Sequence, residues 1–177
     1  CMVPTSREII EKYIDFWNWG MLSKNKGVPW TREFLTMYSH EIHWDSLSSN
    51  TGFPWNSLLF EEHCDEWDWN ILSRNPSLPW SANFISGYLY KFRFGGDRDP
   101  GLCQNTGIKW DESLIEEFKR HFNKYCWQQL SSNTSVDWDD VLYDKFIDYL
   151  DPETLLNNKS FIKNIFDKYD EYEIFNY

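Results

Sequence analysis

The sequence lacks long apolar runs, closely spaced cysteines and an excess of positive charge. None of its 177 residues lies in an apolar stretch near the roughly 18 residues that a membrane-spanning helix needs. The four cysteines form no CxxC pair, which argues against a disulfide framework or zinc finger and favours free thiols. With 17 Lys and Arg against 28 Asp and Glu, the net charge is −11. Because nucleic-acid backbones and anionic membranes bind clustered Lys and Arg, we expect neither as a partner.

The N-terminus also lacks the charged and apolar segments of a signal peptide. We therefore expect a soluble, cytoplasmic protein. Residues 1–4 are equally consistent with a fragment cut from a longer chain.

Aromatic residues are in excess, at 19% of the chain, and the 11 tryptophans follow a repeat. A Leu-Ser-x-Asn pattern, with Cys in place of Ser in one copy, recurs at intervals of 25, 25, 30 and 28 residues. Its copies end at Asn25, Asn50, Asn75, Asn105 and Asn133. A Trp stands five residues after every Asn, and most copies have another three residues before the Leu. This periodicity predicts core packing for the tryptophans, with Trp17 and Trp67 as the candidates for a different, exposed face.

Each repeat is expected to form two helices. After the Asn, apolar residues recur as in Trp30, Phe34, Leu35 and Tyr38, a stripe on one face of a helix expected to run about 10 to 14 residues. The Trp-x-x-Leu-Ser segment predicts a shorter helix, and the Asn at its end is a candidate left-handed cap residue. Helices this short are marginal alone, so they must be stabilised by stacking.

The sequence therefore predicts an all-α fold: an α-solenoid-like array of six to seven helix-turn-helix repeats of about 25 residues, forming a single helical-repeat domain over residues 1–177. The predicted units lie near residues 1–16, 17–41, 42–66, 67–96, 97–124, 125–150 and 151–177.

The pattern W-[DN]-W-x-x-L-S-x-N-x-x-[LIV]-P-W-[ST], read from Trp17 to Thr31 and again from Trp67 to Ser81, resembles a largely uncharacterised helical repeat of bacterial proteins and large DNA viruses. The resemblance covers nearly the whole chain and implies a helical-repeat fold. It implies no catalytic residue and no defined ligand.

The row Asn25, Asn50, Asn75, Asn105 and Asn133 has two interpretations. Each Asn can cap its helix and satisfy backbone groups that would otherwise be unpaired. Alternatively, the row forms a ladder that holds the backbone of an extended peptide, as in other helical solenoids. Hydrogen bonds buried inside the array would exclude the second interpretation.

The insertion, which we define as the stretch Tyr90–Gly101, contains the five extra residues between the third and fourth copies and is the most conspicuous break in the repeat. It carries aromatic and basic residues beside a double glycine, and insertions into repeats map to loops that are often on the binding face. Its candidate partner-binding residues are Lys91, Phe92, Arg93, Phe94 and Arg98. A tolerated surface loop is the alternative.

The C-terminal third is the acidic end of the chain, because residues 125–177 hold 4 basic and 11 acidic groups. Asp137, Asp139 and Asp140 are candidates for contact with a basic partner, which such a surface attracts at long range. Ordinary solubilising charge is the alternative.

The sequence contains few candidates for catalytic or metal-binding residues. His40, His43 and His63, with Cys64, recur in adjacent repeats and could converge on a zinc ion, but their spacing matches no known site. No nucleophile, cofactor motif or phosphate loop is present in the sequence, so we expect no cofactor. The leading prediction is a non-enzymatic scaffold that binds a protein or peptide. The alternatives are an acidic inhibitor or immunity-type protein that occludes a basic, nucleic-acid-handling partner, and a metal-dependent enzyme.

Overall fold

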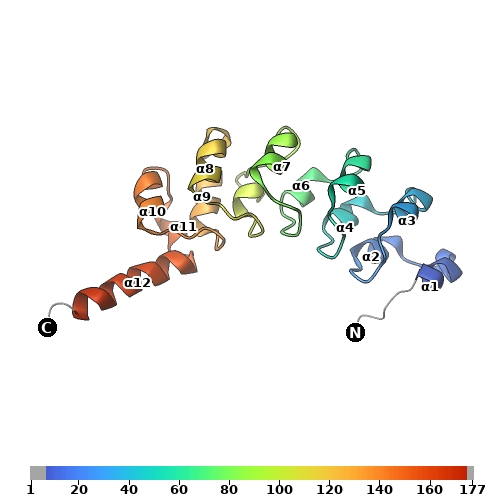
Figure 1. Cartoon of the computed structure of the whole chain (residues 1–177), viewed down its shortest axis with the longest axis horizontal. Coiled ribbons are helices and arrows are strands. Elements are labelled where there is room, and N and C mark those ends of the chain that lie inside the picture. Colours follow the sequence, from blue (N-terminus) through green and yellow to red (C-terminus); the bar gives the residue numbers. More distant parts are fainter. Residues whose placement is uncertain (1–6, 175–177) are drawn as a thin grey trace. The chain divides into compact units, whose positions relative to one another are not determined.

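The computed structural model describes residues 7–174, and the fold of this part is all-α (Figure 1). No strand is present between these residues, where one isolated bridge joins Gly95 and Pro100. The chain divides into two compact parts, an N-terminal part at Cys1–Pro79 and a C-terminal part at Trp80–Tyr177. The single domain stays a prediction.

Short helices alternate in both parts. The N-terminal part contains α1 (Arg7–Lys12), η1 (Ile14–Phe16), α2 (Trp19–Lys24), α3 (Arg32–Met37), α4 (Trp44–Ser48), α5 (Ser57–Glu62) and α6 (Trp69–Leu72). The C-terminal part contains α7 (Ala82–Gly87), η2 (Leu102–Gln104), α8 (Glu112–Phe118), η3 (Lys119–His121), α9 (Lys124–Ser132), α10 (Asp140–Phe146), α11 (Pro152–Leu155) and α12 (Lys159–Ile174).

The second helix of a repeat is shorter than expected. α3, α5 and α7 have 6 residues each, and α8 and α10 have 7. Each begins only after the Trp, because a polar N-cap follows the Trp directly and its side chain accepts a backbone N–H of the first turn. Thr31 caps α3 in this way through Phe34 N, and Asp139 caps α10 through Leu142 N at 2.8 Å. The Pro-Trp pair therefore lies in the turn before the helix.

The Asn that ends a first helix is not left-handed. Asn25 has φ −77° and ψ 119°, and no residue of the described chain, glycine included, has a positive φ. The side-chain Oδ1 of Asn25 instead accepts the N–H of Gly27 at 2.8 Å, and that of Asn50 accepts the N–H of Gly52 at the same distance. The turn after the helix is therefore closed by the Asn side chain.

The cores of both parts are built from the repeated Trp and Leu positions. Leu47 and Leu72 are fully buried, and so is Trp138 at 1% exposure. Buried indoles also bond to the backbone: Trp55 Nε1 donates to Asn50 O at 3.1 Å, and Trp138 Nε1 donates to Leu130 O at 3.3 Å. Each Trp thus contributes apolar area and satisfies one carbonyl at a helix end.

Trp67 is a core residue, which corrects the prediction that it faces outward. It is 4% exposed, and its indole donates to Phe60 O at 3.0 Å and lies over the Phe60 ring. The half-buried Trp17 likewise donates to Ile10 O at 3.0 Å. The reason is that α2 and α6 begin at Trp19 and Trp69, so residues 17 and 67 precede the helix and their indoles bond to the preceding helices, α1 and α5.

Within residues 7–174, no helix is both long enough and apolar enough to cross a membrane.

Candidate partner-binding surfaces

The Asn row lies inside the protein, and within each part its members join a repeat to the one before it. Asn50 Nδ2 donates to Ser23 O at 2.9 Å and Asn25 O at 3.2 Å. Asn75 repeats this pattern 25 residues later, with Ser48 O at 2.8 Å and Asn50 O at 3.4 Å. In the C-terminal part, Asn133 Nδ2 donates to Cys103 O at 2.8 Å and Asn105 O at 3.3 Å.

These contacts correct the prediction that the row binds a partner. Asn50, Asn75, Asn105 and Asn133 are 2–4% exposed, and their amide groups are hydrogen-bonded inside the protein. Asn25, in the first copy of the pattern, is only half-buried. An Asn whose side-chain amide is already hydrogen-bonded in this way is not available to bind a peptide backbone.

The row has one more member, which was not predicted from the sequence. Asn158 is fully buried, donates through Nδ2 to Asn133 O at 2.7 Å, and accepts the N–H of Phe161 at 3.1 Å. The signal was present in the sequence, because Asn158 lies 25 residues after Asn133 and three after Leu155.

The repeated Ser forms a second row of contacts between repeats. Ser23 Oγ accepts the N–H of His43 at 3.1 Å, and Ser48 Oγ accepts that of Asp68 at 3.0 Å. Ser131 Oγ accepts the N–H of Asp151 at 3.0 Å. In each pair the donor comes 20 residues later and caps the first helix of the next repeat, so this Ser orients that helix.

Both phenylalanines of the insertion point inward, which corrects their assignment as exposed contact residues. Phe92 is 6% exposed, and its ring centroid lies 5.3 Å from that of Trp80. Phe94 is half-buried and stacks on His121 at 5.4 Å and 11°. They supply the aromatic packing that Trp provides in regular copies, so their rings are already occupied by contacts within the protein.

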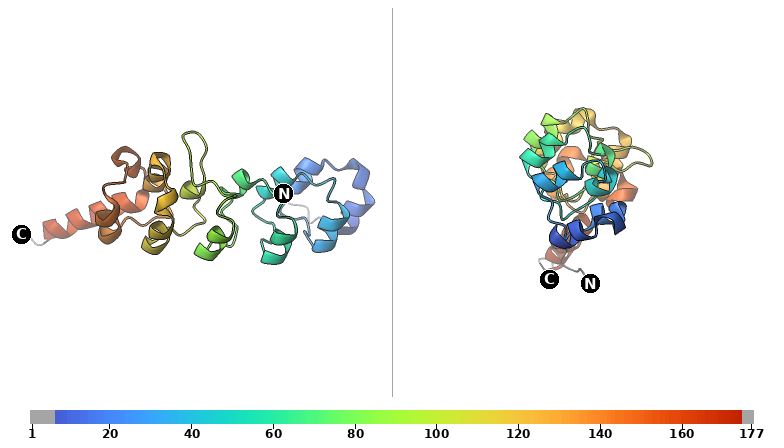
Figure 2. Two further views of the ribbon diagram at one scale, coloured as in Figure 1. Left: turned by 90° about the horizontal axis from the view of Figure 1, so that it is seen from above. Right: turned by 90° about the vertical axis from the view of Figure 1, so that its right-hand side faces the viewer.

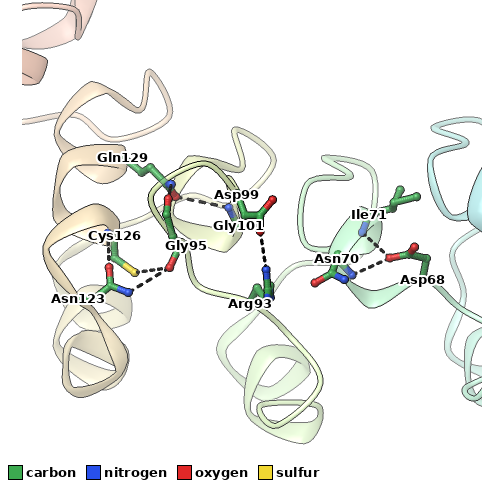
Figure 3. A network of polar contacts seen from close by, with 11 residues as sticks. Asp68, Asn70, Ile71, Arg93, Gly95, Asp99, Gly101, Asn123, Cys126 and Gln129 are labelled. Atoms are coloured by element: carbon green, nitrogen blue, oxygen red, sulfur yellow. Dashed lines mark hydrogen bonds and ion pairs between the residues drawn. The ribbon is translucent and has the colours of Figure 1, made fainter.

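The rest of the insertion forms a narrow loop that projects from the C-terminal part (Figure 2). Its base is held to α9 by Gln129, whose Nε2 donates to Gly96 O at 3.0 Å and whose Oε1 accepts Gly101 N at 3.4 Å (Figure 3). Asn123 Nδ2 donates to Gly95 O at 3.2 Å. At Gly101 a Cβ would lie 2.3 Å from Arg93 O, so the backbone approach requires glycine there.

The basic residues of the insertion differ in their surroundings. Arg93 is exposed and pairs with Asp99 at 2.7 Å across the loop (Figure 3), and Lys91 is half-buried. Arg98 is exposed and lines a hollow of about 340 Å³ together with Tyr125 and Gln128 on α9. Arg98 therefore lies at a hollow between the loop and α9.

Two of the three acidic candidates line a second hollow of the C-terminal part, with a volume of about 510 Å³. Asp137 and Asp139 line it with Asp111 and Glu112 from the preceding repeat. Asp139 also caps α10, whereas the exposed Asp137 accepts a hydrogen bond from an amide of α12 at 3.1 Å. Asp140 forms an ion pair with Lys168. Among the described residues that line this hollow, Lys109 alone is basic.

A hollow of the N-terminal part was not found from the sequence. It measures about 440 Å³ along α4 and α6 and is lined by Lys24 and Arg74, both exposed, with Ile71 half-buried beside them. Lys24 and Arg74 occupy the position directly before the Asn in the first and third copies. Their matching positions could have indicated that they share a face.

The histidines do not form a metal site. His40 and His43 line one hollow, whereas the ring of His63 lies 4.9 Å from that of Trp44 and also contacts Trp67. Burial against these indoles lowers the pKa of His63 below 6.5, against the opposing effect of neighbouring glutamates. In the described chain no group of three or more His, Cys, Asp or Glu side chains is arranged to hold a metal ion.

Comparison of the chain with protein-family models, curated proteins and solved structures finds no match.

Proposed function

We propose that this chain is an α-solenoid-like array of helix-pair repeats whose function is to bind a protein or peptide partner, without catalysing a reaction. The observation that carries the proposal is the division of roles between repeated and variable positions. The repeated Asn, Ser, Leu and Trp side chains are used in contacts within and between repeats, whereas exposed positions change from one repeat to the next.

The exposed apolar residues illustrate this division. Met37 is 58% exposed at a position that holds Glu62 in the next repeat, and Leu58 is 56% exposed where Asn83 stands in the following one. Solenoids recognise partners with such surfaces, because a constant framework supports side chains that are free to vary. The N-terminal hollow, the loop hollow at Arg98 and the acidic hollow at Asp137 are places where a partner segment fits between elements.

The experiment uses surface variants that borrow the residue of another repeat, so that the framework is preserved. For the N-terminal hollow, Lys24 and Arg74 are both changed to Ser, the residue at position 49. For the loop hollow the change is Arg98→Ala, and for the acidic hollow it is Asp137→Lys, as at position 109.

Each variant and the native chain are used to capture partners from a lysate of the source organism, and affinities are then measured with the purified partner. We expect one variant to weaken binding at least tenfold while its thermal unfolding matches that of the native chain. Equal affinities for all variants, or no partner enriched over an unrelated acidic helical protein, would contradict the proposal.

The acidic hollow supports a second candidate function, the occlusion of a basic partner. Four carboxylates and one Lys line it, so a basic segment would be attracted there. This function predicts binding that weakens strongly between low and high salt and is most sensitive to Asp137→Lys. Salt-independent binding would exclude it.

A further inference from the structure

Two residues that break the repeat pattern lie next to each other in the structure. The fourth copy has Cys103 where the others have the repeated Ser, and Cys126 stands seven residues before Asn133. In other copies that second position is the helix cap whose backbone N–H donates to the Ser of the preceding repeat, as Asp68 does to Ser48.

A longer helix explains why the usual hydrogen bond is missing at this junction. α9 begins at Lys124, so Cys126 lies in its first turn and its N–H donates to Asn123 Oδ1 at 3.0 Å. The backbone N–H of Cys126 is therefore not available to donate to the side chain of Cys103. A hydrogen bond between the two side chains takes its place, and both residues contact adjacent residues of the loop, because Cys103 N donates to Phe94 O at 2.9 Å and Cys126 Sγ approaches Gly95 O.

The two thiols are fully buried, and the insertion loop covers them. Cys103 and Cys126 are each 0% exposed, and Cys126 Sγ lies 3.7 Å from Gly95 O in the loop. The base of the loop is held by three hydrogen bonds from Asn123 and Gln129 on α9. The two sides of the loop are also joined at the base, where Leu102 N donates to Arg93 O at 2.8 Å and Cys103 N donates to Phe94 O at 2.9 Å. The thiol pair is therefore closed off until the loop opens.

We propose that Cys103 and Cys126 are a site of reversible oxidation, at which hydrogen peroxide converts the two thiols to an intramolecular disulfide that links η2 to α9. The site is independent of the proposed binding function. Peroxide is small enough to enter when the loop opens, and the partner thiol is already in contact with the sulfur that reacts first.

The order of reaction follows from the electrostatics of the pair. The hydrogen bond from Cys103 stabilises the Cys126 thiolate and lowers the pKa of Cys126 to about 7, whereas burial raises the pKa of Cys103 well above its ordinary value. Cys126 is therefore the nucleophile at neutral pH, since the thiolate is the reactive form.

The chemistry proceeds in two steps. The Cys126 thiolate attacks one peroxide oxygen, the O–O bond breaks, and the departing hydroxide takes up a proton to form water, which leaves a sulfenic acid. The Cys103 sulfur then attacks the Cys126 sulfur, the S–O bond breaks, and the hydroxyl leaves as water with the Cys103 proton. In sum, two thiols and one peroxide give one disulfide and two waters, and two electrons pass to the peroxide.

The test uses the full chain, reduced with dithiothreitol and then exposed to hydrogen peroxide, with remaining thiols alkylated after unfolding. We expect Cys103 and Cys126 to be lost to alkylation together, with a mass decrease of two hydrogen atoms. Mass spectrometry of the digest should show the peptides of these two residues joined, and dithiothreitol should separate them.

Two sets of variants sharpen the test. Cys103→Ser restores the residue of the other repeats, so it should fold, form no disulfide, and leave a Cys126 sulfenic acid that dimedone traps. Gln129→Ala removes two attachments of the loop and should accelerate oxidation about tenfold. Gln128→Ala is the matched control, because Gln128 bonds to Asp151 and not to the loop, and it should leave the rate unchanged.

Three outcomes would overturn the proposal. One is that Cys103 and Cys126 remain fully alkylatable while the half-buried Cys64 is oxidised. Another is a disulfide that involves Cys64 or joins two chains in place of the proposed pair. The third is oxidation of Cys126 to a sulfinic acid without any crosslink.

Discussion

The contribution of the Asn row is measurable because the chain contains its own control. Asn50 makes three side-chain hydrogen bonds, to Ser23 O, Asn25 O and Gly52 N, and is 2% exposed. Asn25 is half-buried and makes one within the described residues, to Gly27 N. The same substitution at the two positions therefore removes different numbers of bonds.

The expected magnitudes follow from these counts. At a net value of about 1 kcal/mol for each hydrogen bond, Asn50→Ala should lower the free energy of unfolding by about 3 kcal/mol. The Asn25 carbonyl keeps Trp30 Nε1 and Val28 N as donors, but the loss of the Asn50 partner at the buried Ser23 raises this figure to about 3–5 kcal/mol. Asn25→Ala should cost only about 1 kcal/mol.

Urea unfolding followed by tryptophan fluorescence and by far-ultraviolet circular dichroism provides the assay, with free energies obtained from the midpoints at constant slope. Asn50→Asp adds a second comparison, because it keeps the acceptor for Gly52 N and loses both donated bonds. It should destabilise the protein at least as much as Asn50→Ala, since it places a charge beside two carbonyls. Equal losses for Asn25→Ala and Asn50→Ala would refute the assignment of the row to contacts between repeats.

Two further predictions concern pH and backbone packing. Burial lowers the pKa of His63, so the unfolded chain binds this proton more tightly than the folded chain does. The stability that neutral His63 contributes is therefore complete above pH 6.5, and it is lost as the pH falls through 6.5 toward the lower pKa of the folded chain. His63→Tyr, which installs the residue of the neighbouring repeats, should reduce the fall in melting temperature between pH 7.5 and about 5.5. The control variant His40→Asn, at an exposed site, should leave this fall unchanged. Identical pH profiles for the native chain and both variants would argue against a role of His63 in the pH dependence. Gly101→Ala places a Cβ 2.3 Å from Arg93 O and should destabilise the C-terminal part by more than about 1 kcal/mol. Gly87→Ala in α7, where a Cβ meets nothing within 4 Å, should instead stabilise this part by up to about 1 kcal/mol. Calorimetry that ranks the stabilities of the two variants in the opposite order would contradict the packing described at the loop.

Much of the fold was predictable because it depends on local periodicity. The spacing of Trp and Leu predicted helices, and the helices and buried residues lie at those positions. Helix lengths were less predictable, since the polar residue after each Trp competes to cap the helix and moves its start by several residues. Thr31 and Asp139 show this, because each accepts a backbone N–H that an earlier helix start would have used.

The candidate site was less predictable than the fold. A repeated Asn is compatible with a cap, a contact between repeats and a ligand-binding ladder, and these differ only in what lies opposite the amide. Exposure of Phe92 and Phe94 was equally undetermined, because an insertion changes the register and the same aromatic residues pack inward or outward depending on the loop path.

The sequence by itself determined that the chain is helical, that its tryptophans are periodic, and that its surface is acidic, since these follow from composition and from spacing along one helix. Only the tertiary structure decided which side chains meet across repeats. It placed the Asn and Ser rows inside, brought Arg98 and Asp137 to hollows, and paired Cys103 with Cys126. The physical reason is that hydrogen bonds and burial depend on partners some 20 to 30 residues away, whose distance and direction are set by how the short helices stack.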